Sequence, residues 1–314
     1  MVAERFDFKG RGVTVGAAES RQRFGSALRV VLDYVALTKP RVMSLLLFTA
    51  LGGSFVAARG VPPWQYIVVV LIGGALASGG ASALNMWYEE DIDREMHRTD
   101  HRPVAGGRIR PMNALIFGIV LNVASFVVFY VFSNVLAAAL AVAGSALYVV
   151  LYTALLKRST AQNIVIGGAA GAIPPLVGYA AILGMLELEA WYLFAIVFFW
   201  TPPHFWALSL LIKDDYARAE IPMMPVIAGE AATRIQILLY TVLMLPLTAL
   251  YYLATSKLGV MYLASAVLLG LIFVGLAVRM WRTGERRDTA NLYKYSLLYL
   301  FLLFTALMVD AATV

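Results

Sequence analysis

The stretch WQYIVVVLIGGALASGGASALNMWYEEDIDREMHRTDHRP, residues 64–103, joins an apolar run to a densely charged one. Residues 64–88 contain no Asp, Glu, Lys or Arg, whereas residues 89–103 hold six carboxylates and three arginines. A helix of about 20 apolar residues crosses the ~30 Å hydrocarbon core of a bilayer. The stretch therefore predicts a transmembrane helix that delivers a cluster of charge to one membrane surface.

The same apolar pattern recurs along most of the chain. Of its 314 residues, 61% are hydrophobic and 14% are charged, whereas a soluble domain is usually about 45–50% apolar and about 25% charged. We predict an all-α membrane protein with nine transmembrane helices. The predicted spans are 41–58, 64–87, 113–132, 135–156, 163–183, 191–212, 232–254, 259–280 and 292–313.

The basic residues indicate the orientation of these spans. If the N-terminus is cytoplasmic, all of the 25 Lys and Arg residues except Arg59 and Lys257 lie in inner segments or the adjoining helix ends. Positive residues concentrate in cytoplasmic loops, so we expect an N-in, C-out protein. The acidic loops 88–112 and 213–231 then face the cytoplasm. The same rule accounts for the net charge of +6, which implies no nucleic-acid partner.

Two regions are expected along the chain: a cytoplasmic tail over residues 1–37 and a membrane domain over 38–314. The first residues lack the apolar core of a signal peptide. From Ser26, the pattern SALRVVLDYVALTKP predicts a short amphipathic helix on the inner membrane surface. The absence of cysteine excludes disulfides, thiolate metal sites and haem attachment through Cys-x-x-Cys-His.

Asn85, Glu89 and Asp93 are spaced four residues apart at the end of the second span. On a helix this spacing places their side chains on one gently winding stripe, each about 6 Å beyond the last. Three oxygen donors on one stripe suit Mg²⁺, which takes few protein ligands and completes its coordination with water and phosphate. Asp91 points to the opposite face and is a poorer candidate.

The alternative is a solvated acidic turn tied by ion pairs to Arg94 and Arg98. Asn85 favours the metal site, because it begins the stripe inside the apolar run, where a polar group is costly without a partner.

The second acidic loop reads LIKDDYARAEIPMMPV over residues 211–226 and contains Lys213, Asp214 and Asp215. Two acidic segments on one membrane face are consistent with a pair of metal ions that hold one polyanion between them. Basic residues that would neutralise the phosphates are Arg41, Arg98, Arg102, Lys157 and Lys213. Taken singly, each of these cations is better explained as an ordinary positive-inside residue.

Taken together, the motifs resemble those of a known family, the intramembrane UbiA-type prenyltransferases, and in detail its haem O synthase (protohaem IX farnesyltransferase) branch. The resemblance begins with the Asn85, Glu89 and Asp93 spacing and MHRTDHRP at 96–103, and it covers nearly the whole chain from about residue 33. The other similar stretches are LTKPRV (37–42), YTALLKR (152–158), NIVIGGAAGAIPPLVGY (163–179), WTPPHFWAL (200–208) and DDYARAEIPMMPV (214–226).

The resemblance implies a specific fold and chemistry. The nine helices would surround a central cavity that opens near the cytoplasmic face of a bacterial inner membrane. One or two Mg²⁺ ions would be held by Asn85, Glu89, Asp93 and Asp215. Farnesyl diphosphate would be the donor and haem b the acceptor; water would add to the vinyl group to give haem O and diphosphate. A haem A synthase or terminal oxidase assembly proteins are further expected partners.

The chain departs from the family at its second Asp-x-x-x-Asp motif. Asp214 is followed four residues later by Arg218, and Asp215 by Ala219. The ligands of a second metal ion therefore stay open, and one ion or two unequal sites both fit the sequence.

His204 lies in TPPHFWAL early in an apolar span. We expect it either to face the haem, as an iron ligand or through a propionate, or to be satisfied by a neighbouring helix. The glycines Gly167, Gly168 and Gly171 likewise either allow close helix packing or make room for a flat porphyrin.

Two competing functions remain from the sequence. One is a prenyltransferase of the same family with a quinone, chlorophyll-type or lipid acceptor. The other is an ion transporter, although transporters bind their ions near the bilayer midplane and the charges here cluster at one face.

Overall fold

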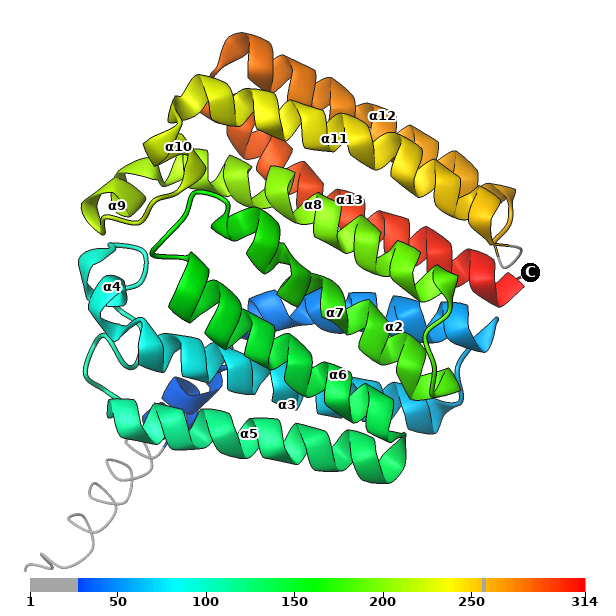
Figure 1. Cartoon of the computed structure of the whole chain (residues 1–314), viewed down its shortest axis with the longest axis horizontal. Helices are drawn as coiled ribbons and strands as arrows, with labels where there is room; N and C mark the ends of the chain where they lie inside the picture. The colour runs from blue at the N-terminus through cyan, green and yellow to red at the C-terminus, as the bar shows by residue number, and fades with distance from the viewer. Residues whose placement is uncertain (1–27, 256–257, 314) are drawn as a thin grey trace, which may run out of the picture.

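Nine helices dominate the structure, a computed structural model that describes residues 28–255 and 258–313 (Figure 1). Within this part of the chain there is no strand, and nine helices are long and apolar enough to cross a membrane. They are α2 (Pro40–Ala58), α3 (Trp64–Tyr88), α5 (Pro111–Phe132), α6 continued by the π-helix η1 (Val135–Leu156), α7 (Asn163–Leu183), α8 (Leu188–Leu211), α11 (Gly229–Ala254), α12 (Val260–Thr283) and α13 (Arg286–Thr313).

Each predicted span corresponds to one of these helices, and the ends are set by local chemistry. Pro40 and Pro111 occupy the first turns of α2 and α5, where a missing N–H costs nothing. Gly184 and Gly284 end α7 and α12 in the left-handed conformation, at φ 70° and 63°. The clearest difference is α13, which begins at Arg286 rather than at 292, because the polar residues RRDTAN form its first turns outside the apolar run.

The nine helices form a closed ring in chain order. Each span packs against the next, from α2 on α3 to α12 on α13, and α13 packs back against α2. The two most extensive cross-contacts, α2 with α7 and α8 with α13, draw the ring together. In Figure 1 α2 and α7 accordingly run through the middle, with α3 and α5 on one side and α11 and α12 on the other.

The α2–α7 contact depends on glycine. A Cβ at Gly178 would lie 1.8 Å from the Ala50 carbonyl oxygen, and one at Gly53 would lie 2.1 Å from the Pro175 carbonyl oxygen. No side chain fits at either position, so the two backbones pack directly together. The buried Ser54 hydroxyl then donates to the Gly178 carbonyl across the contact (3.0 Å), as is common between membrane helices.

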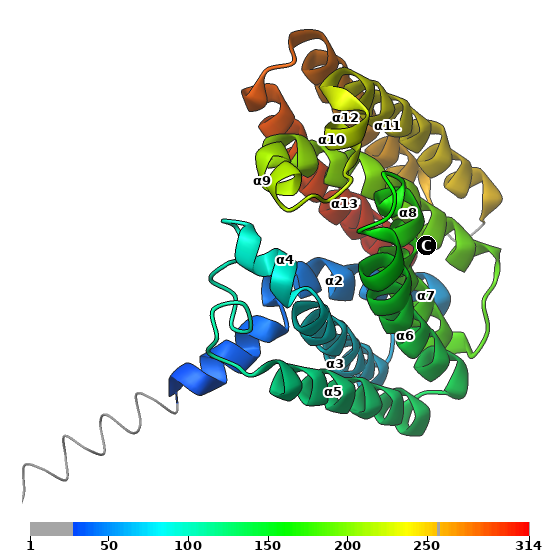
Figure 2. The same ribbon diagram turned by 60° about the vertical axis from the view of Figure 1, so that its left-hand side comes forward.

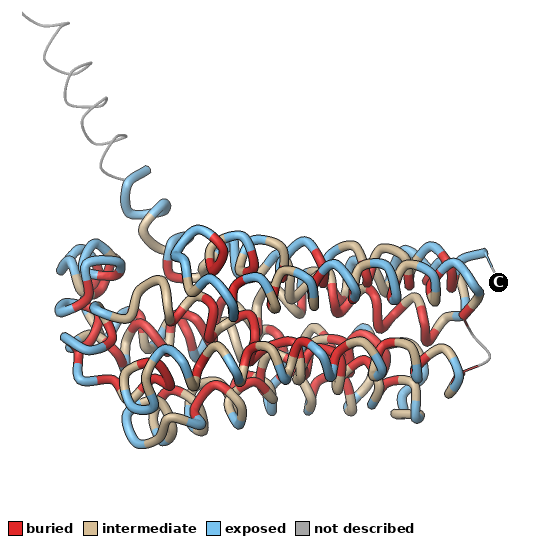
Figure 3. Tube along the Cα trace, turned by 90° about the horizontal axis from the view of Figure 1, so that it is seen from above, coloured by how far each residue is buried: buried red, intermediate tan, exposed pale blue. Residues whose placement is uncertain are grey.

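Buried residues lie on the inner sides of the helices, and exposed ones lie on the rim (Figure 3). Many exposed residues are large and apolar, among them Val120, Val127, Leu239, Leu268 and Leu271. This pattern is expected where the outer surface faces lipid rather than water.

Three short helices gather at one end of the ring (Figures 1 and 2). They are α4 (Glu90–Glu95), α9 (Lys213–Arg218) and α10 (Met224–Ile227). The two acidic loops of the sequence therefore lie at the same end of the molecule. Residues 28–37 are also helical, and Asp33 accepts a hydrogen bond from Arg108 Nε (2.9 Å). The remainder of the predicted tail, residues 1–27, lies outside the described residues.

Candidate functional site

The predicted stripe of Asn85, Glu89 and Asp93 is continuous across the junction of α3 and α4. Glu89 N donates to Asn85 O (2.9 Å) and Asp93 N donates to Glu89 O (2.8 Å), so the helical spacing is kept through the break. The three residues are buried, with exposed fractions of 2%, 1% and 2%. We call these three residues the acidic stripe.

Each member of the acidic stripe is paired with a cation. Lys39 Nζ donates to Asn85 Oδ1 (2.6 Å), and Lys157 Nζ donates to Glu89 Oε1 (2.5 Å). Arg102 Nη1 contacts both carboxylate oxygens of Asp93, at 2.7 and 2.8 Å. The buried carboxylates are therefore charge-compensated, as burial of an ionised group requires.

The backbone places these cations. Lys39 adopts a left-handed conformation (φ 50°, ψ 61°) immediately before α2, which turns its side chain to Asn85 rather than leaving it on the surface. Lys157 follows directly after η1, and Arg102 lies in the loop after α4.

The π-helix η1 (Leu147–Leu156) supplies the wall opposite the stripe. Thr153 Oγ1 accepts from Asn85 Nδ2 (3.0 Å) and donates to the Tyr148 carbonyl five residues earlier (2.9 Å). Lys157 N likewise donates to Tyr152 O, five residues back (2.9 Å). Thr153 therefore faces Asn85, and Lys157 faces Glu89. π-Helical segments are rare and often lie at functional sites.

Burial and charge shift two groups at this site. Burial lowers the pKa of the Lys39 ammonium to about 7, and the nearby Arg102 charge adds to this, against the attraction of Glu89 and Asp93. Burial by itself would raise the pKa of the Glu89 carboxyl. The Lys157 ammonium and its hydrogen bond, with a smaller effect from Lys39, hold that pKa below its ordinary 4.5.

The second acidic loop contributes in a different way. Asp214 is exposed, Asp215 pairs with Arg218 (3.3 Å), and Lys213 pairs with Glu230 (3.3 Å). Its following turn, residues 219–221, faces α4 across a pocket of about 220 Å³.

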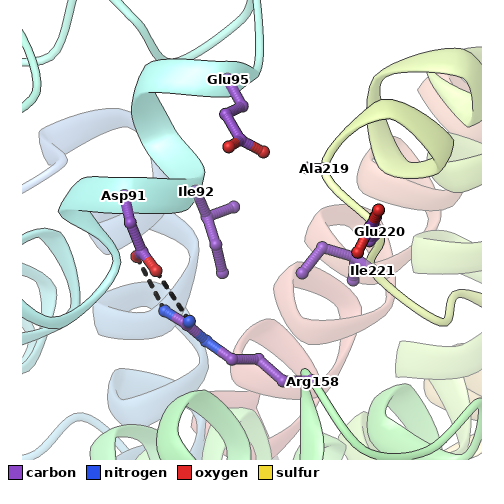
Figure 4. Close-up of a pocket in the computed structure, with 7 residues that line it drawn as sticks. All are labelled: Asp91, Ile92, Glu95, Arg158, Ala219, Glu220 and Ile221. Carbon is purple, nitrogen blue, oxygen red and sulfur yellow. Dashed lines mark hydrogen bonds and ion pairs between the residues drawn. The ribbon is translucent and has the colours of Figure 1, made fainter.

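In Figure 4, Glu95 and Glu220 lie on opposite sides of this pocket, and Arg158 reaches Asp91 at its edge. Arg158 makes two hydrogen bonds to the Asp91 carboxylate, each 2.8 Å. This fixes Asp91 on the face away from the acidic stripe, as its position in the sequence predicts.

The structure brings five predicted site residues together: Asn85, Glu89, Asp93, Arg102 and Lys157. Arg41 and Arg98, predicted as phosphate ligands, are exposed.

Lys39 and Thr153 are the contacts that sequence reasoning missed. Lys39 stands two residues before Arg41 in LTKPRV, and the proline between them is the signal that the chain turns there. Thr153 carries no such signal.

The donor set of the acidic stripe fits Mg²⁺. One amide and two carboxylate oxygens are hard ligands of the kind that this ion prefers. Among the described residues, however, no group of three His, Asp or Glu side chains converges as a ready metal cluster. Asp215 is thus not gathered with Glu89 and Asp93, and its role as a ligand stays a prediction.

His204 lies on α8 between two aromatic rings, Trp200 (centroids 4.4 Å apart) and Tyr293 (5.0 Å). Its Nδ1 is 2.7 Å from Ser296 Oγ, and that hydroxyl donates to the Tyr293 carbonyl (2.7 Å). The hydroxyl therefore accepts from Nδ1–H, which leaves the lone pair on Nε2. Ser296 on the neighbouring helix α13 is thus a hydrogen-bond partner for one ring nitrogen of His204. This agrees with the expectation that a neighbouring helix satisfies the imidazole.

The model of the UbiA prenyltransferase family matches residues 46–305. The chain is 52% identical over 281 residues to a protoheme IX farnesyltransferase of Chloroflexus aurantiacus, covering 90% of this chain and 48% of that protein. It is 51% identical over 295 residues to one of Symbiobacterium thermophilum, covering 93% of this chain and 98% of that protein. The chain thus spans about half the length of the Chloroflexus relative and nearly all of the Symbiobacterium one.

Solved structures share the fold at low sequence identity. One described as digeranylgeranylglyceryl phosphate synthase has a TM-score of 0.74 at 16% identity, covering 90% of this chain and 99% of that one. A UbiA homologue from Archaeoglobus fulgidus, bound to DMAPP and Mg²⁺, has a TM-score of 0.68 at 16% identity, covering 88% and 99%. With its ring of nine spans and its acidic stripe at one end, the chain belongs to the UbiA prenyltransferase family.

Proposed function

We propose that this chain transfers a farnesyl group from farnesyl diphosphate to a vinyl group of haem b, with addition of water, to give haem O and diphosphate. The observation that carries the proposal is the acidic stripe with its three cations at the end of an apolar ring of helices. The names of the relatives, at about half identity over most of the chain, support haem b as the acceptor.

The charges of the site suit a diphosphate held with a divalent cation. Lys39, Lys157 and Arg102 face only two carboxylates, Glu89 and Asp93, which leaves one positive charge in excess when all are ionised. A diphosphate carries more negative charge than this single excess positive charge can balance. Asn85, Glu89 and Asp93, with Asp215 as a further candidate, would hold a Mg²⁺ ion, which would supply the remaining positive charge and stabilise the leaving diphosphate.

The chain's own residues then act on the leaving group. Lys157 and Arg102 donate charge-assisted hydrogen bonds to phosphate oxygens as negative charge develops there. The allylic C–O bond breaks with its electron pair on the diphosphate. The vinyl group attacks the farnesyl carbon, and water adds to the cation that forms beside the porphyrin and loses a proton. The apolar helices keep water from the farnesyl cation before this attack.

His204 is proposed as a contact of the haem, since its Nε2 lone pair is left available by Ser296. The proposed setting is the bacterial inner membrane, with the site facing the cytoplasm, in the N-in, C-out orientation. Hand-over of haem O to a haem A synthase or to oxidase assembly proteins belongs to the same proposal.

Product mass tests the reaction directly. Purified protein is incubated with haem b, farnesyl diphosphate and Mg²⁺, and we expect a haem that has gained one farnesyl group and one water. EDTA should abolish the product and added Mg²⁺ should restore it. Asp93→Asn should reduce turnover about 100-fold or more, whereas Asp91→Asn, on the opposite face of α4, should retain it.

Two results would contradict the proposal in different ways. If haem is untouched but the diphosphate is consumed with an aromatic acceptor, haem is not the acceptor, although prenyl transfer stands. If no acceptor reacts in folded protein and ions cross liposomes, the chain acts as a transporter.

A further inference from the structure

Asn163, the first residue of α7, is a buried amide that the site described above does not use. It is 0% exposed, and neither its Oδ1 nor its Nδ2 has a hydrogen-bond partner in the structure. Buried polar groups are nearly always paired, because an unpaired one loses its hydration without compensation. An amide in this position indicates a ligand that completes its hydrogen bonds.

The chain connects Asn163 closely to the acidic stripe. Thr160 N donates to Leu156 O (3.1 Å) and Asn163 N donates to Thr160 O (3.3 Å), so residues 156–163 form a compact pair of turns. At the start of these turns Lys157 is bonded to Glu89 and Arg158 to Asp91. Two adjacent ion pairs therefore fasten these turns, which lead into α7, to Glu89 at the α3–α4 junction and to Asp91 on α4.

Asn163 also lies on the face of α7 that is turned to η1. Asn163, Gly167 and Gly171 follow at steps of four and share one face of α7. A Cβ at Gly167 would lie 2.4 Å from the Tyr152 ring, so this face is turned to η1. A Cβ at Gly171 would meet nothing within 4 Å. The face thus leads from an unpaired amide to a space that no side chain fills.

The end of α7 is itself suited to an anion. The helix has 21 residues and no side-chain cap at its N-terminus. The N–H groups that follow Asn163 in its first turn, together with the helix dipole, therefore favour a negative ligand. The space at Gly171, about two turns further along α7, suits an apolar chain attached to that ligand.

We propose that Asn163 and the N-terminus of α7 bind phosphate oxygens of the prenyl diphosphate, with Asn163 Nδ2 as a donor. The inference rests on the proposed function and extends it by further phosphate contacts on α7, beside η1 and close in sequence to Lys157.

The test compares affinity and stability in the same variants. Asn163→Leu and Asn163→Asp should each raise KM for farnesyl diphosphate about tenfold or more, by loss of a hydrogen bond to a charged group. Inhibition by inorganic pyrophosphate with Mg²⁺ should weaken by a similar factor. Asn163→Leu should also raise Tm, because it replaces an unsatisfied polar group by an apolar one of similar size. A structural amide predicts the opposite pattern, a lower Tm and an unchanged KM, and would overturn the inference.

Asn122 provides the matched control. Its Oδ1 is also buried without a partner, but it lies on α5 and its Nδ2 donates to Gly118 O (2.9 Å). Asn122→Leu should leave KM unchanged.

Further outcomes separate this inference from the reaction itself. If pyrophosphate binding depends on Asn163 but the protein does not convert haem, the anion site is supported and haem b is not the acceptor. If Asn163→Leu forms product with an unchanged KM for farnesyl diphosphate, the proposed reaction is supported and the phosphate site at Asn163 is contradicted. If phosphatidylglycerol, but not pyrophosphate, competes in an Asn163-dependent way, the amide serves a lipid headgroup and the inference is wrong.

Discussion

Lys39 shows how much of the proposed chemistry depends on single side chains. It is the cation whose pKa burial lowers to about 7, and it bonds directly to Asn85. Arg41, two residues later, is exposed. The two residues are close in sequence but differ in environment, which makes them a natural pair for mutation.

We expect Lys39→Met to raise KM for farnesyl diphosphate about tenfold, because it removes the positive charge in excess of the two carboxylates that we propose helps to balance the diphosphate. Arg41→Met should change KM less than about twofold, as is usual for a solvated surface charge. Steady-state kinetics at fixed haem concentration measure both. A larger effect at Arg41 would contradict the placement of these two side chains.

The Asp91–Arg158 pair allows a prediction about pH. Hydrogen bonds from Arg158 lower the pKa of the Asp91 carboxyl below 3.8. Because the folded-state pKa is lowered, the pair stabilises the fold above the ordinary pKa, and this contribution is lost as pH falls through the lowered value. The side chains are 64% and 38% exposed, so a double-mutant cycle should give a coupling of only about 0.2–1 kcal/mol at pH 7. Chemical unfolding at pH 7 and pH 3 measures it, and a coupling that grows in acid would contradict the assignment.

At the scale of residues, the sequence is informative where helical spacing alone sets the geometry. The steps from Asn85 to Glu89 and Asp93 predict one stripe, and the hydrogen bonds confirm it. Lys39 rather than Arg41 contacts Asn85 because the backbone of Lys39 is left-handed immediately before Pro40. Composition does not reveal this conformation. Helical spacing does not predict the contact of Thr153 with Asn85, because a π-helix has more residues per turn than an α-helix and so brings different side chains to the site.

At the scale of elements, hydropathy predicts the nine spans, because each must bury its backbone polar groups within one apolar helix. Hydropathy does not predict the short helices α4, α9 and α10, which pack against α3, α8 and α11. It also misses the fastening of α12 to α13. There, the buried Asp310 carboxylate on α13 accepts from the backbone N–H groups of Gly259 and Tyr262 at the start of α12.

Asp310 therefore acts as an N-terminal cap supplied from another helix. We expect Asp310→Ala to destabilise the protein by about 1–2 kcal/mol, the range for loss of a helix cap, while KM stays unchanged. Thermal unfolding in detergent measures the effect. Thr305→Ala, which removes a hydroxyl bonded only within its own helix, is the control and should have little effect. Equal losses in both variants would show that Asp310 is not a specific cap.

At the scale of the whole molecule, the closed ring and the placement of both acidic loops at one end agree with the predicted architecture. The order in which helices pack could not be predicted from hydropathy, because lipid-facing and ring-facing apolar residues have similar composition. Small residues such as Gly53 and Gly178 decide it through backbone contact.

The orientation of the ring in the membrane can be measured, since the chain has no cysteine of its own. Cysteines are introduced at Asp100, in the loop after α4, and at Met185, between α7 and α8, both of which are exposed. A membrane-impermeant maleimide applied to intact cells should label Met185→Cys alone, and lysed cells should show label at both positions. The reverse pattern would place the acidic loops outside.

A ring closed by its first and last spans also constrains how the protein is made. The seam between α2 and α13, where the Phe48 and Phe301 rings stack 4.6 Å apart, forms only after the final helix has entered the membrane. The acidic stripe and its cations come from residues 39–157, so they are complete on the nascent chain after four insertions. His204 and its partner Ser296 meet only at the end of synthesis. The acidic stripe, which we propose binds the diphosphate with Mg²⁺, is therefore assembled during translation, while the part proposed to receive haem awaits its completion.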